Sequence, residues 1–63
     1  MDIVEIGNRI KSARVSKKMS QRDLVAATGL TLPCVQSVEG GKQNYTIGSL
    51  IKILQALDLA ITI

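Results

Sequence analysis

The 63-residue sequence contains no histidine, phenylalanine or tryptophan, and only one cysteine, one proline and one tyrosine. Without histidine, the commonest catalytic base and a frequent zinc ligand are missing, and Cys34 has no partner for an internal disulfide. The five carboxylates form no convergent pair in the sequence. We therefore expect no enzymatic activity, no catalytic residue, no metal and no cofactor. The scarcity of aromatic residues requires a core of Ile, Leu, Val and Ala, which favours packed helices.

Long apolar runs are also absent. No segment approaches the roughly 20 apolar residues that cross a bilayer, and the first residues, MDIVEI, include acids and lack the basic region that precedes the apolar core of a signal peptide. A single cysteine is typical of a reducing compartment. We expect one cytoplasmic domain over residues 1–63 that does not contact a membrane.

The positive charge is concentrated in the first half of the chain. Up to Thr31 there are six basic and three acidic residues, a difference of +3, whereas beyond it two lysines balance Glu39 and Asp58, and the total is +3. This asymmetry is typical of a surface that faces a polyanion, but it also fits the ordinary solvation of a small domain.

Apolar residues recur at three- and four-residue steps in four segments, which predicts four helices. We expect them over residues 2–16, after an N-cap at Ser20, after an N-cap at Thr31, and after an N-cap at Thr46. The fourth helix has a wide apolar face made of Ile47, Leu50, Ile53, Leu54 and Leu57. Each helix is too short to be stable alone, so the sequence predicts an all-α fold of packed short helices.

The second and third predicted helices are joined by a short turn at Gly29, where a left-handed residue is expected. Two short helices with such a turn are typical of a helix-turn-helix, whose second helix can enter the DNA major groove. A helix pair is also the commonest way to build a small helical core. On this pattern alone, DNA binding stays one interpretation among others.

The stretch SQRDLVAATGLTLPCVQSVEGGK closely resembles the helix-turn-helix of the Cro and phage-repressor (lambda-repressor-like) family. The matching positions are Gln21, Leu24, Ala27, Gly29, Val35, Val38, Glu39, Gly41 and Lys42, and IGNRIKSAR and SLIKILQALDL resemble the first and fourth helices of the family. The resemblance implies a lambda-repressor-like fold and sequence-specific binding of double-stranded DNA. We expect a small transcriptional regulator that represses by occlusion.

The same resemblance implies roles for individual residues in DNA binding. Base contacts are expected from Leu32, Pro33, Gln36 and Ser37. Phosphate contacts are expected from Gln21, Arg22, Thr31, Lys42, Gln43 and Asn44.

The sequence departs from the usual family pattern at Leu32 and Pro33, because neither side chain can form a bidentate hydrogen bond to a purine. What remains is contact with a thymine methyl group, pairing of the Gln36 amide with adenine, and the Ser37 hydroxyl. Alternatively, Pro33 serves only to begin the helix and Leu32 contacts a partner protein.

Two further side chains have structural interpretations. The resemblance implies an ion pair between Arg14 and Glu39 that links the first helix to the end of the third. Cys34 lacks a neighbouring base for nucleophilic chemistry, and we interpret it as a small side chain filling space on a helix surface.

The final residues, LDLAITI, alternate as a strand does, with Leu59, Ile61 and Ile63 on one side. A lone apolar strand can pair with a second copy, which predicts a dimerisation strand over residues 59–63 in a homodimer that binds an inverted repeat. This ending resembles that of HipB-like antitoxins. A docked hydrophobic tail, or a chain cut within a longer protein, explains the same pattern.

Two other functions remain open at this point. The domain can be the antitoxin of a toxin–antitoxin pair, with a toxin protein as its main partner. It can also be a helix-turn-helix used only for protein interaction.

Overall fold

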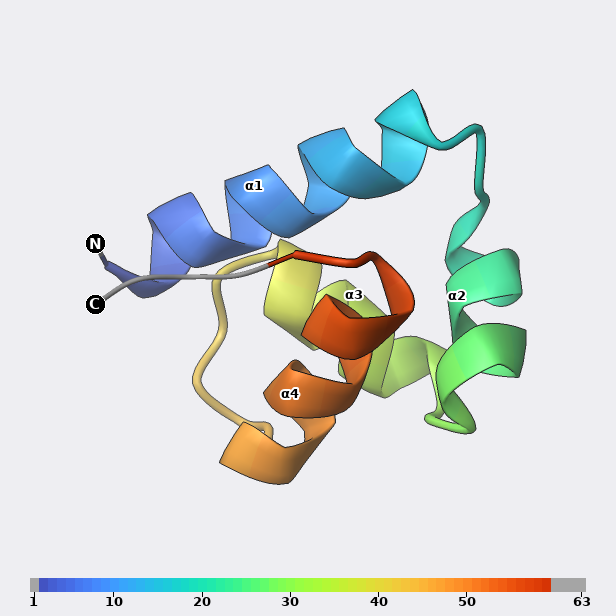
Figure 1. The fold of residues 1–63 in the computed structure, drawn as a ribbon. Coiled ribbons are helices and arrows are strands. Elements are labelled where there is room, and N and C mark those ends of the chain that lie inside the picture. The colour runs from blue at the N-terminus through green and yellow to red at the C-terminus, as the bar shows by residue number, and fades with distance from the viewer. Residues whose placement is uncertain (1, 60–63) are drawn as a thin grey trace.

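The computed structural model describes residues 2–59, which form four helices: α1 (Ile3–Ser16), α2 (Gln21–Thr28), α3 (Leu32–Glu39) and α4 (Ile47–Ala56). Helix α1 packs on α3, and α2 packs on both α3 and α4 (Figure 1). The predicted all-α fold is confirmed. None of the helices in residues 2–59 is long and apolar enough to cross a bilayer.

Each helix begins after a residue whose side chain accepts a hydrogen bond from the backbone N–H three positions later. The four N-caps are Asp2, Ser20, Thr31 and Thr46. At α2 the bond is reciprocated, because Asp23 accepts from the N–H of Ser20 in a capping box. Local side-chain chemistry therefore sets all four helix starts, and the caps predicted at Ser20, Thr31 and Thr46 are confirmed.

Each of the four helices is followed by a left-handed residue, and after α1, α3 and α4 this residue reverses the chain in the same way. These residues are Lys18 after α1 (φ 58°), Gly41 after α3 (φ 72°) and Asp58 after α4 (φ 54°). The next N–H then reaches back five residues, as in a Schellman motif. The bonds are Met19 N–H to Arg14 O at 3.1 Å, Lys42 N–H to Ser37 O at 3.0 Å, and Leu59 N–H to Leu54 O at 2.9 Å.

One apolar core joins all four helices. Its buried members are Ile10, Leu24, Val35, Val38, Leu50, Ile53 and Leu57. Burial of each of the larger side chains contributes about 1.5–3 kcal/mol, so the fold depends on a small number of contacts.

The prediction for the apolar side of α4 is wrong at Ile47, which is 70% exposed. Ile47 lies in the first turn of α4, one turn before the first buried residue, Leu50. The apolar stripe thus extends beyond the part of α4 that the other helices cover. Ala27 of α2 is also exposed, although it is apolar.

Gly7 allows α1 to lie directly against the end of α3. A Cβ atom at this position would be 2.5 Å from the carbonyl oxygen of Val38 and 2.8 Å from that of Glu39. Both obstacles are backbone atoms and cannot rotate away. The distance between α1 and α3 therefore requires glycine here.

The predicted strand at residues 59–63 is not seen in the part of the chain that the structure describes. Leu59 instead closes the Schellman motif after α4, and its half-buried side chain packs against the core. The sequence pattern failed at this residue because capping and packing on the same helix compete with strand formation. Ile61 and Ile63 lie outside the described residues.

Candidate nucleic-acid interface

The turn between α2 and α3 is fixed by its own side chains. Gly29 adopts the left-handed conformation (φ 73°) expected from the sequence. The Thr28 hydroxyl donates to the carbonyl oxygen of Leu24 at 2.8 Å and accepts from the N–H of Leu30 at 3.2 Å. Because Thr31 then caps α3, the direction of α3 relative to α2 is set within a few residues.

Helix α3 has one buried side and one accessible side. Val35 and Val38 face the core and have no exposed surface. The four side chains predicted to contact bases are all accessible: Pro33 and Gln36 are exposed, and Leu32 and Ser37 are half-buried. They share one side of α3, because Gln36 and Ser37 follow Leu32 and Pro33 by four residues.

The accessible side of α3 carries no charged group. Helix α3 as a whole has two ionisable side chains, Glu39, which is buried, and Cys34, which is a half-buried free thiol. A side without arginine or lysine lacks the usual bidentate donors to guanine.

Glu39 is paired with Arg14 of α1, as the resemblance to the Cro and phage-repressor family implies. Arg14 Nε donates to one carboxylate oxygen at 2.7 Å and Nη2 donates to the other at 3.0 Å, while Nη1 donates to the carbonyl oxygen of Met19 at 2.8 Å. The side chains are only 10% (Arg14) and 4% (Glu39) exposed. The hydrogen bond to Glu39 raises the pKa of Arg14, and it outweighs the opposite effect of burial. The pair joins α1, the loop after it and the end of α3.

The carboxylate of Glu39 also orients two glutamines, which the sequence did not predict. Gln21 Nε2 donates to Glu39 Oε1 at 3.3 Å, and Gln36 Nε2 donates to Gln21 Oε1 through a long hydrogen bond of 3.5 Å. A carboxylate can only accept, so Gln21 must turn its NH2 group toward Glu39 and its oxygen toward Gln36. Gln36 keeps its oxygen and one N–H for another partner. These contacts join residues far apart in the sequence, and no local pattern predicts them.

The residues predicted to contact phosphate lie in three places. Gln21 and Arg22 form the start of α2, Thr31 caps α3, and Lys42, Gln43 and Asn44 follow α3. All are exposed except Gln21, which is half-buried.

The start of α2 offers more backbone donors than the start of α3. Ser20 occupies the N–H of Asp23, so the N–H groups of Gln21 and Arg22 remain for an anion. At α3 the N–H of Cys34 is occupied by Thr31, and Pro33 has none. The first turn of α2 therefore keeps two free backbone donors, and the first turn of α3 keeps only the N–H of Leu32. Hydrogen bonds from Ser20 lower the pKa of Asp23, which lies in the same first turn of α2.

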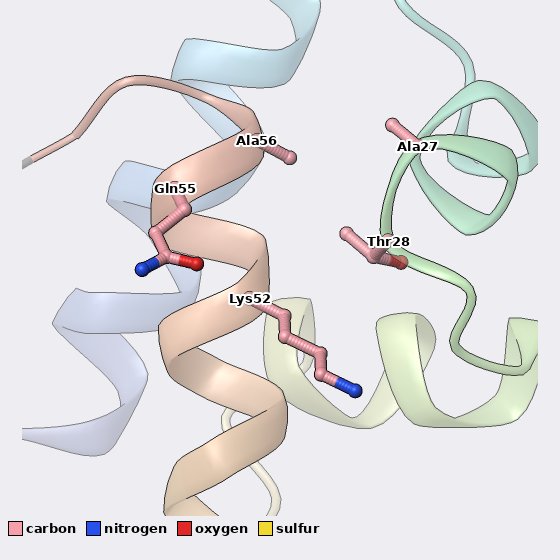
Figure 2. Close-up of a pocket in the computed structure, with 5 residues that line it drawn as sticks. All are labelled: Ala27, Thr28, Lys52, Gln55 and Ala56. Atoms are coloured by element: carbon pink, nitrogen blue, oxygen red, sulfur yellow. The ribbon is translucent and has the colours of Figure 1, made fainter.

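A separate hollow lies between α2 and α4 (Figure 2). It is lined by Ala27, Thr28, Lys52, Gln55 and Ala56, and the Lys52 ammonium is its one charged group. None of the residues predicted to contact DNA lines it.

Two short helices joined by a fixed turn, with an accessible side on the second helix, define a helix-turn-helix DNA-binding domain. The profile of the family described as Helix-turn-helix (HTH_3) matches residues 10–63. The chain belongs to this Cro/C1-type helix-turn-helix family of transcription regulators.

Similar proteins support this assignment. The chain is 40% identical over 58 residues to the uncharacterized HTH-type transcriptional regulator y4dL of Sinorhizobium fredii. The aligned region covers 92% of this chain but only 30% of that protein. The fold of this chain is similar to that of the restriction-modification controller protein C.AhdI from Aeromonas hydrophila (TM-score 0.81, 33% identity, covering 92% of this chain and 88% of the other). It is also similar to a mutant of the controller protein C.Esp1396I (TM-score 0.79, 28% identity, 95% and 80%).

Proposed function

We propose that this chain binds double-stranded DNA sequence-specifically as a homodimer and represses transcription by occluding the DNA it covers. The observation that carries the proposal is the accessible, uncharged side of α3. Groups suited to binding phosphate lie on both sides of α3 in the sequence. They are the unoccupied N–H groups at the start of α2 and the Lys42 side chain after α3. Phosphate contacts position such a helix, and base contacts give it specificity.

Gln36 is the residue we expect to discriminate most between bases. Its amide oxygen and remaining N–H match the N6 donor and N7 acceptor of adenine, and a good bidentate contact of this kind is worth about 1–3 kcal/mol. Gln21 holds the other N–H of Gln36, so less rotamer freedom is lost on binding. We therefore propose that α3 prefers an A·T pair at the position that Gln36 contacts.

A homodimer would place two copies of α3 on half-sites about 34 Å apart, so that two modest contacts act together. Leu59 caps α4, so the support for a shared strand is the alternation of Ile61 and Ile63 with Ala60 and Thr62 in the sequence. Removal of residues 60–63 keeps this cap. It should lower the dimer fraction in sedimentation and weaken operator binding more than Lys42→Ala does. A truncated chain that binds as tightly as the full chain would rule out this strand.

A protein partner is the second candidate function, and it has one observation in its favour. Ile47 and Ile51, one turn apart on α4, are 70% and 46% exposed. A toxin or another protein that binds away from α3 would be expected to use such apolar surface.

Selection of duplexes from a randomised pool at about 0.15 M salt, where non-specific binding is weak, separates the two candidates. Enrichment of an inverted repeat is expected. No enrichment would refute sequence-specific binding and favour the protein partner. The partner would then be sought by pull-down, with Ile51→Asp as the control variant that disrupts the exposed apolar surface of α4.

Two variants assign the contacts on the selected duplex. Gln36→Ala should relax the preference at one base pair per half-site. Lys42→Ala should weaken all sequences alike and reduce the salt slope by about 1 for each phosphate that the lysine neutralises. Lys52→Ala, which removes a lysine on α4, is the matched control and should leave binding within about twofold.

A further inference from the structure

We infer that the first turn of α3 recognises the C5-methyl group of a pyrimidine in the DNA major groove. The inference rests on the proposed DNA binding and specifies the chemistry that this helix selects. Leu32 and Pro33 are the first two residues of α3, half-buried and exposed respectively. In helix-turn-helix proteins the residues at the start of the second helix contact base edges. The part of this chain that approaches the bases first is therefore apolar.

Neither side chain can form a hydrogen bond to a base. Leu32 has a purely aliphatic side chain, and Pro33 has no polar side-chain atom and no backbone N–H. Thr31 uses its hydroxyl to cap α3 by accepting from the N–H of Cys34 at 3.3 Å. The side chains of Leu32 and Pro33 thus present carbon atoms where other helices present donors and acceptors, and the donors left in this turn are the Thr31 hydroxyl and the N–H of Leu32.

The major groove has one apolar feature that such a surface can select. Thymine carries a methyl group at C5, where cytosine has only a hydrogen atom, and the oxygen and nitrogen groups of the four base edges are hydrogen-bond donors and acceptors. 5-Methylcytosine carries the same methyl group at the same position. Burying it against Leu32 or Pro33 is favourable, and burying a polar edge there is costly.

The turn is also rigid enough to discriminate by shape. Proline fixes its own φ, the Thr31 cap fixes the start of α3, and Val35 in the next turn has no exposed surface. Little conformational freedom remains to be lost on contact. Gln36 lies one turn further along the same side, so the methyl contact and the adenine contact fall within the same half-site.

The test uses the full chain and the duplex selected above, with each thymine replaced in turn by uracil. Uracil lacks only the methyl group, so the hydrogen-bonding pattern is unchanged. We expect affinity to fall about fourfold at one or two positions per half-site, the factor that corresponds to about 0.8 kcal/mol for one methyl-sized group. At the remaining thymines we expect less than a twofold change.

Leu32→Ala and Pro33→Ala link the effect to the first turn of α3. At each sensitive position, one of the two variants should bring the thymine-to-uracil affinity ratio close to one. Val15→Ala removes an exposed apolar side chain from α1 and should leave the ratio unchanged. Because each ratio compares two duplexes with one protein, partial unfolding of a variant does not alter it.

A second set of duplexes distinguishes the two sources of the methyl group. A C·G pair and a 5-methylcytosine·G pair replace the sensitive T·A pair. A gain of about fourfold on methylation of cytosine shows that the methyl group is recognised in either base. A preference confined to T·A shows that the contact also needs the adenine opposite.

The outcomes separate this inference from the function on which it rests. If no duplex is enriched, the proposed DNA recognition fails. If a duplex is enriched but every uracil substitution changes affinity less than twofold, or neither α3 variant alters the ratio, methyl recognition by the first turn of α3 is overturned while DNA recognition stands.

Discussion

Arg14→Met removes a guanidinium that makes three hydrogen bonds, two to Glu39 and one to the carbonyl oxygen of Met19. It leaves the Glu39 carboxylate, whose side chain is 4% exposed, without its cation. Breaking a buried ion pair on one side costs about 3–5 kcal/mol, mostly because the remaining charge stays buried. Domains are stable by about 0.05–0.15 kcal/mol per residue, which gives about 3–9 kcal/mol for this length. The variant should therefore lose most of the stability of the fold.

Thermal unfolding followed by circular dichroism measures this loss, with two matched controls. Lys18→Met removes a nearby exposed cation and keeps an unbranched side chain at a left-handed position. Arg9→Met breaks an exposed pair with Glu5 at 3.6 Å, and exposed pairs contribute about 0–1 kcal/mol. With about 4–8 °C per kcal/mol for a domain of this size, Arg14→Met should melt at least about 12 °C lower than the wild type. Equal melting temperatures for Arg14→Met and Lys18→Met would refute the reasoning.

A double variant tests whether the cost comes from an unpaired charge. In Arg14→Met/Glu39→Met both charged groups are replaced by apolar side chains, and such replacements are often neutral or stabilising relative to the ion pair. We expect the double variant to melt higher than either single variant. If the destabilisation of the double variant equals the sum of those of Arg14→Met and Glu39→Met, burial of an unpaired charge is not the main cost.

Three further predictions concern backbone and capping. Gly7→Ala should destabilise the fold because its Cβ would lie 2.5 Å from a backbone oxygen. Gly48→Ala, whose Cβ would have only a side-chain atom at 3.9 Å, should stabilise α4 by about 0.5–1 kcal/mol. Urea unfolding compares the two variants, and a change of the same sign in the free energy of unfolding would contradict the close approach at Gly7. Asp58→Gly should raise the melting temperature, since glycine adopts the left-handed conformation without the steric cost that aspartate, which tolerates it better than most residues, still has. Asp58→Asn separates the effect of charge. The lowered pKa of Asp23 means that its contribution is present above its ordinary pKa and is lost as pH falls through the folded value, so the stability gap between wild type and Asp23→Asn should shrink from about pH 5 to pH 2; a constant gap would exclude this role.

Helix positions could be predicted from the sequence because they depend on neighbouring residues. The caps at Ser20, Thr31 and Thr46 involve residues three positions apart, and the left-handed turn at Gly29 needs only the glycine itself. The pair between Arg14 and Glu39 spans 25 residues and was expected only through resemblance to a family.

The failures share one physical cause, which is competition between local pattern and tertiary packing. Ile47 fits the apolar periodicity of α4 but lies beyond the surface that the other helices cover. Leu59 fits a strand pattern but caps the helix before it. Periodicity shows which residues share a side of an element, and it does not show how far the neighbouring elements extend over that side.

The contacts of Glu39 connect stability to base recognition. One carboxylate accepts hydrogen bonds from Arg14, which holds α1, and from Gln21, which in turn accepts from Gln36 on the accessible side of α3. The amide of Gln21 could face Gln36 with either its oxygen or its nitrogen, and only an acceptor-only group at Glu39 makes one orientation clearly favourable. Glu39→Gln removes that requirement, because a glutamine at this position can donate as well as accept. If Gln36 reads adenine as proposed, its orientation depends on the buried carboxylate of Glu39 through Gln21, and Glu39→Gln should weaken that preference in the duplex selection.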